Sequence, residues 1–275
     1  MGISIDGAEA DEITIDGEET QEITVDGEIV YESGSPGSAD LVAGTMESGY
    51  FGEVSANDLI TGEDLCTEIG LSEGTLQHSD ENWLKFANQG KILFIHKKTI
   101  RNSVSWDAIA SAGAVYGDNS SQGNAQITID GLTYKVRLMK GAGSDPTDSY
   151  DDNDHGSLDR DENGNIIDPN WFEGMRNEWN ALMLPIHVNA DGNNWAYPDY
   201  VPANVPDWGM GFTDEDLLTN NDYGSGSYSW CQETRDTDIS RRVYHGRNGV
   251  SFLATGASSF AHSAYGFRPV LELIE

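Results

Sequence analysis

Three consecutive ten-residue units at the start of the chain each place β-branched residues at alternate positions and then continue with Asp-Gly. The units span residues 3–12, 13–22 and 23–32, and they align without gaps. Alternation predicts a strand with one buried face, and Asp-Gly supplies the positive φ angles of a tight hairpin turn. The clearest hairpin is expected over residues 23–30, with its turn at Asp26.

Hairpins this short bury little apolar surface by themselves. We therefore expect residues 1–32 to dock on another subunit or another protein, because strand edges are templates for pairing. An ordinary small β-meander is the alternative interpretation. Residues 33–38 are rich in Ser and Gly, as linkers are, so residues 33–80 are expected to form a linker and a small segment with a short helix near 56–69.

The chain is strongly acidic, and its basic residues are confined to one part. Its formal net charge is −32, from 47 Asp and Glu against 15 Lys and Arg. The first basic residue is Lys85, and 21 acidic residues precede it. Such a field repels phosphate backbones and anionic membrane surfaces, which argues against nucleic acid and membranes as partners. No run approaches the roughly 18 apolar residues of a spanning helix, so membrane insertion is not expected.

The remainder, residues 81–275, reads as one α+β domain with few long periodic runs. Ser105 is a helix-capping residue before an apolar segment, Asp130-Gly131 marks a hairpin, and Pro185 interrupts a one-faced helix. The expected elements are a strand at 90–98, a helix at 105–112, a hairpin at 126–141, a helix at 177–188 and short strands at 229–234, 241–246, 249–254 and 267–274.

This order of elements, with the closing motifs RRVYHGRNGVSF and YGFRPVLEL, resembles the C-type lectin-like fold in its formylglycine-generating-enzyme-like branch. The resemblance implies that the strands at 90–98 and 267–274 pair, and that long loops on one side carry binding. The sequence departs from the family pattern at Arg247-Asn248-Gly249, where two glycines and a serine are common.

The chain as a whole also resembles phage virion proteins with an ITIDG-type opening and stretches such as AGTMESGYFGEVSANDLITG and WLKFANQGKILFIHKK. The resemblance implies a virion surface protein, on the tail rather than the head, that docks on other virion proteins through residues 1–32. Its lectin-like loops would bind host-surface glycan or protein, and a homo-oligomer, a trimer by analogy, is expected. A capsid-decorating protein without ligand binding is the alternative.

Catalysis is not expected from the residues present. Enzymes of the resembled branch oxidise substrates with a cysteine pair near the C-terminus, whereas Cys231 stands alone in that half and Cys66 lies far from it. The six histidines show neither metal-ligand spacing nor a recognisable triad. A polysaccharide hydrolase needs only two placed carboxylates and stays a distant third possibility.

One acidic stretch matches the first part of a calcium loop. Oxygen ligands stand at positions 1, 3 and 5, Gly164 follows at position 6, and the Glu usual at position 12 is missing because Asn170 stands there. An acidic insertion without a cation is the alternative. The calcium ligands expected are Asp159, Asp161, Asn163, Asn165 and Asp168, with Glu173 as the alternative to Asp168.

Aromatic side chains among Asn, Asp, Ser and Gly suit sugars, which offer apolar faces and hydroxyl rings. Core or loop packing is the alternative for each of them. The loops 190–228 and 255–264 are the best candidates for an exposed surface, and residues 256–266 resemble the variable, ligand-facing segment of phage adhesins. The expected ligand-binding residues are Trp195, Tyr197, Tyr200, Trp208, Tyr223, Tyr228, Phe260, His262 and Tyr265.

Overall fold

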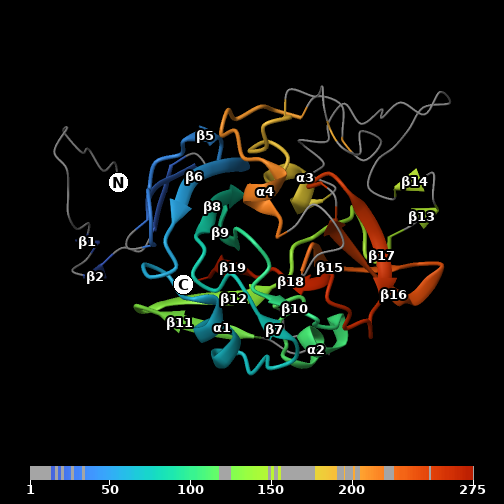
Figure 1. The fold of residues 1–275 in the computed structure, drawn as a ribbon. Coiled ribbons are helices and arrows are strands. Elements are labelled where there is room, and N and C mark those ends of the chain that lie inside the picture. The colour runs from blue at the N-terminus through green and yellow to red at the C-terminus, as the bar shows by residue number, and fades with distance from the viewer. Residues whose placement is uncertain are drawn as a thin grey trace.

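The computed structural model is mostly β-sheet with few helices over the part of the chain that it describes (Figure 1). With side chains it describes residues 35–117, 125–147, 177–190, 195, 201, 205–219, 226–247 and 249–274. As backbone alone it describes residues 14–15, 18–19, 22–25, 28–32, 150–151 and 154–155. Among the helices of these residues, none is long and apolar enough to cross a membrane.

A seven-stranded sheet forms the centre of the molecule, and its neighbouring strands are antiparallel. In spatial order it comprises β11 (Gln126–Ile129), β12 (Leu132–Arg137), β19 (Val270–Leu273), β9 (Lys91–His96), β8 (Trp83–Asn88), β6 (Ser48–Val54) and β5 (Ala43–Gly44).

A six-stranded sheet carries the C-terminal part of the chain. In spatial order it comprises β17 (Leu253–Ala257), β16 (Asp238–Gly246), β15 (Tyr228–Arg235), β18 (Tyr265–Phe267), β10 (Arg101–Asn102) and β7 (Thr75–Leu76). Within this sheet β15 and β18 are parallel neighbours, with Tyr228 opposite Tyr265. That pairing brings two aromatic residues distant in sequence to one end of the sheet.

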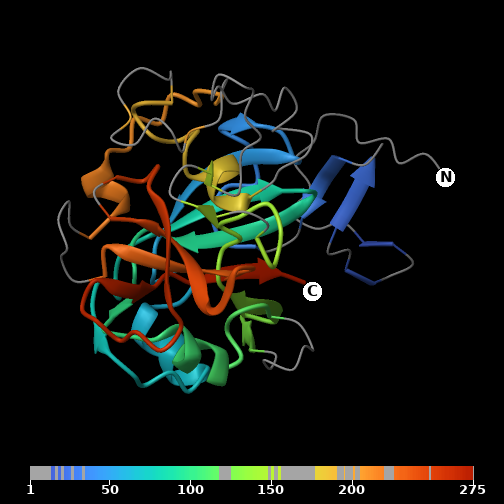
Figure 2. The same ribbon diagram turned by 90° about the vertical axis from the view of Figure 1, so that its right-hand side faces the viewer.

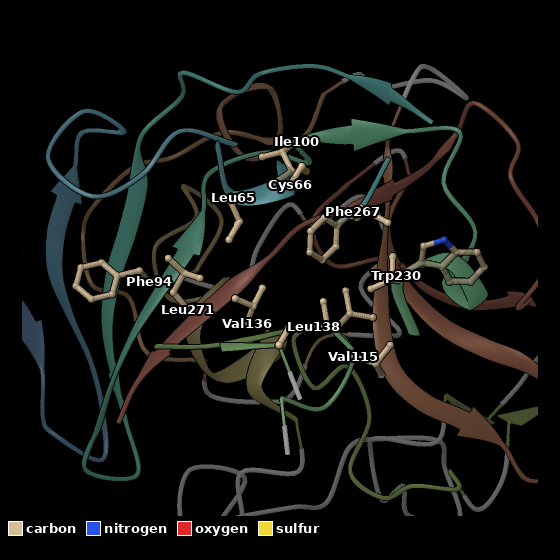
Figure 3. Close-up of a cluster of buried hydrophobic side chains, with 14 of the residues drawn as sticks. Leu65, Cys66, Phe94, Ile100, Val115, Val136, Leu138, Trp230, Phe267 and Leu271 are labelled. Atoms are coloured by element: carbon tan, nitrogen blue, oxygen red, sulfur yellow. The ribbon is translucent and has the colours of Figure 1, made fainter. Parts of the chain in front are cut away.

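Both faces of the seven-stranded sheet are buried at β8 and β9, which explains the continuous apolar run of β9. Ile92 and Phe94 point into one apolar cluster, whereas Leu93 and Ile95 point into another on the opposite face. The first cluster joins the two sheets and includes Leu65 of α1 (Gly62–Glu68), as Figure 3 shows. The second cluster lies against α3 (Glu178–Leu182) and α4 (Asp214–Leu217).

The local signals for helices and turns are confirmed in part. Ser105 caps α2 (Trp106–Ser111), and its side chain accepts a hydrogen bond from the N–H of Ala108 at 3.1 Å. Asp130 and Gly131 have φ angles of 49° and 89° and join β11 to β12 as the expected hairpin. Two helices are shorter than expected. The one expected over 177–188 ends at Leu182, and the one expected near 56–69 is α1, which begins only at Gly62.

The pairing of the strands at 90–98 and 267–274 is confirmed. Within these segments β9 and β19 are antiparallel neighbours, with Val270 opposite Ile95 and Leu271 opposite Phe94. The strand expected at 249–254 lies instead at β17, because residues 249–252 form the turn that leads into it.

The domain boundary at residue 81 requires correction. Strand β6 pairs with β8 along its length, and α1 contributes Leu65 and Cys66 to the apolar cluster between the sheets. Residues 43–80 therefore belong to the same folded unit as the rest and are not a linker segment. A strand pairs where its apolar face can be buried. The local composition around β6 therefore could not indicate that its partner is β8, which lies much further along the chain.

The N-terminal units form two hairpins of their own, β1 (Thr14–Ile15) with β2 (Glu18–Glu19) and β3 (Glu22–Val25) with β4 (Glu28–Glu32). Both are two-stranded sheets, separate from the two large ones. They lie at the periphery of the molecule in both ribbon views (Figure 2). A further two-stranded sheet joins β13 (Tyr150–Asp151) and β14 (Asp154–His155).

A buried network of ion pairs joins two strands of the seven-stranded sheet to α3. The guanidinium of Arg137 on β12 donates to both oxygens of Glu178 at 2.7 and 2.8 Å, and its Nε donates to Glu272 on β19 at 2.9 Å. Burial alone would lower the pKa of Arg137, but the two carboxylates outweigh burial and raise it. The network fixes the start of α3 to the middle of the sheet.

We predict that Arg137→Met lowers the free energy of unfolding by about 3–5 kcal/mol, because it leaves Glu178 buried without its cation. Lys97→Met is the matched control, since Lys97 pairs with Glu53 in a partly exposed bridge worth at most about 1 kcal/mol. Urea unfolding monitored by tryptophan fluorescence measures both. Equal losses in the two variants would contradict the importance of the buried network.

Candidate functional site

The turn between β17 and β18 opens a pocket of about 560 Å³ at the end of the six-stranded sheet. Backbone hydrogen bonds hold the turn: the N–H of Phe260 donates to Ala257 at 2.9 Å, and that of Tyr265 to His262 at 2.9 Å. The N–H of Tyr228 on β15 donates to the carbonyl of Ala264 at 2.8 Å. The pocket is lined by Tyr228, Ser259, Phe260, Ala261, His262, Ala264 and Tyr265.

An aromatic cluster supports the pocket from below. The ring of Tyr265 stacks on Trp230 with centroids 4.5 Å apart and meets Tyr228 edge-on at 5.0 Å. Tyr244 contacts Tyr265 edge-on at 5.3 Å. A Cβ on Gly256 would lie 2.8 Å from the Tyr265 hydroxyl, so the glycine makes room for that ring. Stacked and edge-on pairs of this kind fix ring positions, which makes the floor rigid.

Two side chains of the turn are exposed above this floor. Phe260 is 48% exposed, and its ring centroid lies 5.9 Å from that of Tyr265. His262 is exposed, and its Nδ1 accepts a hydrogen bond from the N–H of Ala264 at 3.2 Å. In the neutral imidazole that bond places the proton on Nε2, which is then a donor for a ligand. The pocket thus combines an apolar platform with a polar rim.

The structure brings four of the nine expected ligand residues together in this pocket: Tyr228, Phe260, His262 and Tyr265. Tyr228 and Tyr265 are largely buried and form its wall and floor, so they also belong to the core. Two more, Trp195 and Trp208, pack in the apolar cluster beside α3. Trp195 is buried there and stacks on His187, with ring centroids 4.8 Å apart, so it does not face solvent. The remaining three, Tyr197, Tyr200 and Tyr223, lie outside the described residues.

The sequence indicated segment 256–266 as ligand-facing, but it did not single out three residues that line the pocket: Ser259, Ala261 and Ala264. Only their place in the turn could have indicated these residues, because small side chains in a turn between strands have no chemistry that is typical of a binding site. Nor did the sequence single out Tyr244 and Trp230 as the support of the floor, since that role follows from strand pairing.

The expected calcium ligands, Asp159, Asp161, Asn163, Asn165 and Asp168, all lie outside the described residues. In the part of the chain that is described, no group of three or more His, Cys, Asp or Glu side chains is arranged to hold a metal ion. The calcium loop therefore stays a prediction from sequence.

Three titratable groups with perturbed pKa values, Cys231 and Glu233 of β15 and His245 of β16, are buried away from the pocket. Burial raises the pKa of Glu233 to about 8, although its oxygens accept the N–H of Gly141 at 3.0 and 3.1 Å. Burial lowers the pKa of His245 to about 4 and raises that of the Cys231 thiol well above its usual value. None of the three lines the pocket, and each is at most 3% exposed.

No family model, no curated protein and no solved structure matches the chain.

We predict that Glu233 makes the protein less stable as the pH rises from 7 to 8. Its folded pKa of about 8 exceeds the usual value of 4.5, so the folded state binds the proton more tightly and this stability is lost as pH rises through the folded value. The slope approaches about 1.4 kcal/mol per pH unit for one proton.

Chemical unfolding at pH 7.0, 7.5 and 8.0 measures that slope, and Glu233→Gln is expected to flatten it. His245 and His96 do not interfere, because their lowered folded pKa values, about 4 and about 3, place their contribution below the unfolded value of 6.5. An unchanged slope in Glu233→Gln would show that Glu233 is already ionised in the folded protein at pH 7.

Proposed function

We propose that the chain is a binding protein of a phage virion surface, whose pocket at residues 259–265 holds a saccharide of the host surface. The observation that carries the proposal is the exposed ring of Phe260 above the rigid floor of Tyr228 and Tyr265. Sugar rings stack on aromatic faces and hydrogen-bond to polar rims, and this pocket offers both. Binding loops on a rigid sheet are the usual arrangement for recognition.

A C-type lectin-like fold is part of the proposal. It is supported by the antiparallel pairing of β9 with β19, which joins an early strand to a late one. It is also supported by α3 and α4, which both follow β12 and precede β15 in the chain and pack in the same apolar cluster on one face of the central sheet. The motifs YGFRPVLEL and RRVYHG contribute β18, β19 and part of β16 to this arrangement.

Residues 1–32 are proposed to attach the protein to the particle. The hairpins β1–β2 and β3–β4 pair only within themselves, so among the described residues their outer edges have no strand partner. Two-stranded hairpins gain stability when a further strand or surface covers them, which favours a docking role. Multiple copies on one particle would strengthen weak binding at each pocket.

Phe260→Ala is expected to weaken saccharide binding at least about tenfold, because it removes the exposed half of the stacking platform. Ile239→Ala is the control, since Ile239 is a 74% exposed apolar residue on β16 outside the pocket. A glycan array identifies bound saccharides, and titration by tryptophan fluorescence gives their affinities, because Trp230 stacks beneath Tyr265. Equal binding by the two variants would remove the pocket as the binding site.

Immunogold labelling of intact particles with an antibody against residues 81–275 tests the virion assignment. Gold at the tail tip or fibres is the expected result, and deletion of residues 1–32 should abolish it. Gold spread over the head would favour the alternative, a capsid-decorating protein. Unlabelled wild-type particles would contradict the virion assignment.

A further inference from the structure

The pocket changes its chemistry between its mouth and its inner end. Four of the described residues that line it are exposed and form the mouth: Ser259, Phe260, Ala261 and His262. Three are at most 8% exposed and form the inner end: Tyr228, Ala264 and Tyr265. All three belong to the apolar cluster between the two sheets. The pocket therefore ends on the hydrophobic core of the molecule.

The side chains of the inner end offer mainly carbon to a ligand. Ala264 contributes a methyl group. The ring of Tyr228 stacks on Tyr244, with centroids 4.7 Å apart and an angle of 8° between the ring planes. The hydroxyl of Tyr265 forms a hydrogen bond with Tyr244. A ligand group that reaches this depth meets methyl and ring carbon.

The backbone groups of the inner end already have partners within the protein. The N–H of Ala264 donates to Nδ1 of His262 at 3.2 Å, and its carbonyl accepts the N–H of Tyr228 at 2.8 Å. The N–H of Tyr265 donates to the carbonyl of His262 at 2.9 Å. A ligand hydroxyl buried beside these groups would lose its water without gaining an equivalent partner, which costs free energy.

The mouth has the polar side chains that the inner end lacks. Ser259 carries a hydroxyl, and Nε2 of His262 is a donor when the imidazole is neutral. Phe260 lies between them in the turn and is 48% exposed. Hydroxyl groups of a sugar ring that rests on Phe260 can bond to these two side chains and to solvent.

From this division we infer that the pocket selects saccharides that carry a methyl group, as an N-acetyl or a 6-deoxy substituent, and holds that methyl against Ala264. Burial of a methyl group is favourable, whereas burial of an unpaired hydroxyl is not, so both effects favour the same ligand. The inference rests on the proposed function, because it assigns a ligand class to the same pocket.

The test uses two pairs of saccharides that differ only at the substituent. N-acetylglucosamine and N-formylglucosamine differ by one methyl group, and L-fucose and L-galactose differ by one hydroxyl group on the sixth carbon. Titration by tryptophan fluorescence compares the affinities within each pair. The expected preference is about fivefold for the N-acetyl over the N-formyl compound, or at least about tenfold for L-fucose over L-galactose. The pair that shows its preference identifies the substituent.

Ala264→Ser and Ala261→Ser are matched variants, because the same hydroxyl is added at the inner end in one and at the exposed mouth in the other. Ala264→Ser is expected to reduce the preference within the pair at least about threefold, since a polar group then meets the methyl. Ala261→Ser should leave it unchanged. Thermal melting confirms that each variant is folded, and the wild-type comparison decides if Ala264→Ser is not.

Equal affinity within both pairs, with binding lost in Phe260→Ala, would overturn the inference and leave the proposed function standing. A preference that Ala264→Ser and Ala261→Ser change equally would overturn it as well, because the methyl would not lie at the inner end. A chain that binds no saccharide of a glycan array, or binds equally well in Phe260→Ala, would contradict the proposed function itself.

Discussion

The ion pairs of Arg137 with Glu178 and Glu272 fix α3 and two strands of the central sheet relative to one another. It joins β12 and β19 in the middle of the seven-stranded sheet to the first turn of α3, and α3 covers one face of that sheet. The other face packs on the six-stranded sheet that carries the pocket. A charge network at this depth is tolerated only when every charge is matched, and here the guanidinium has a carboxylate on each side.

Acidic and aromatic residues are interspersed along the chain, but the fold gathers several aromatic residues at the pocket. Acidic residues are spread over the whole sequence, yet none of the described residues that line the pocket is acidic. The aromatic residues that form and support its floor come from β15, β16 and β18. Because β15 and β18 pair in parallel, Tyr228 and Tyr265 meet although a long segment separates them. Strand order therefore creates the pocket, and the turn after β17 completes it.

Much of the local structure could be predicted from the sequence, because its signals are local. The Ser105 cap, the turn at Asp130 and the apolar run of β9 each depend on neighbouring residues. The place of β6 in the central sheet could not be predicted, since it depends on a partner strand further along the chain. The same limit applies to the site: Phe260 was recognisable as a turn aromatic, whereas the support of Tyr265 by Trp230 and Tyr244 follows only from the fold.

The position of β19 between β9 and β12 has a consequence for synthesis on the ribosome. Strand β9 emerges early, and its free edge faces solvent until Val270–Leu273 have left the exit tunnel. The central sheet therefore closes late, after the intervening loops, the pocket turn and the six-stranded sheet have been made. During that interval the nascent chain exposes the unpaired edge of an apolar strand, a feature that invites aggregation.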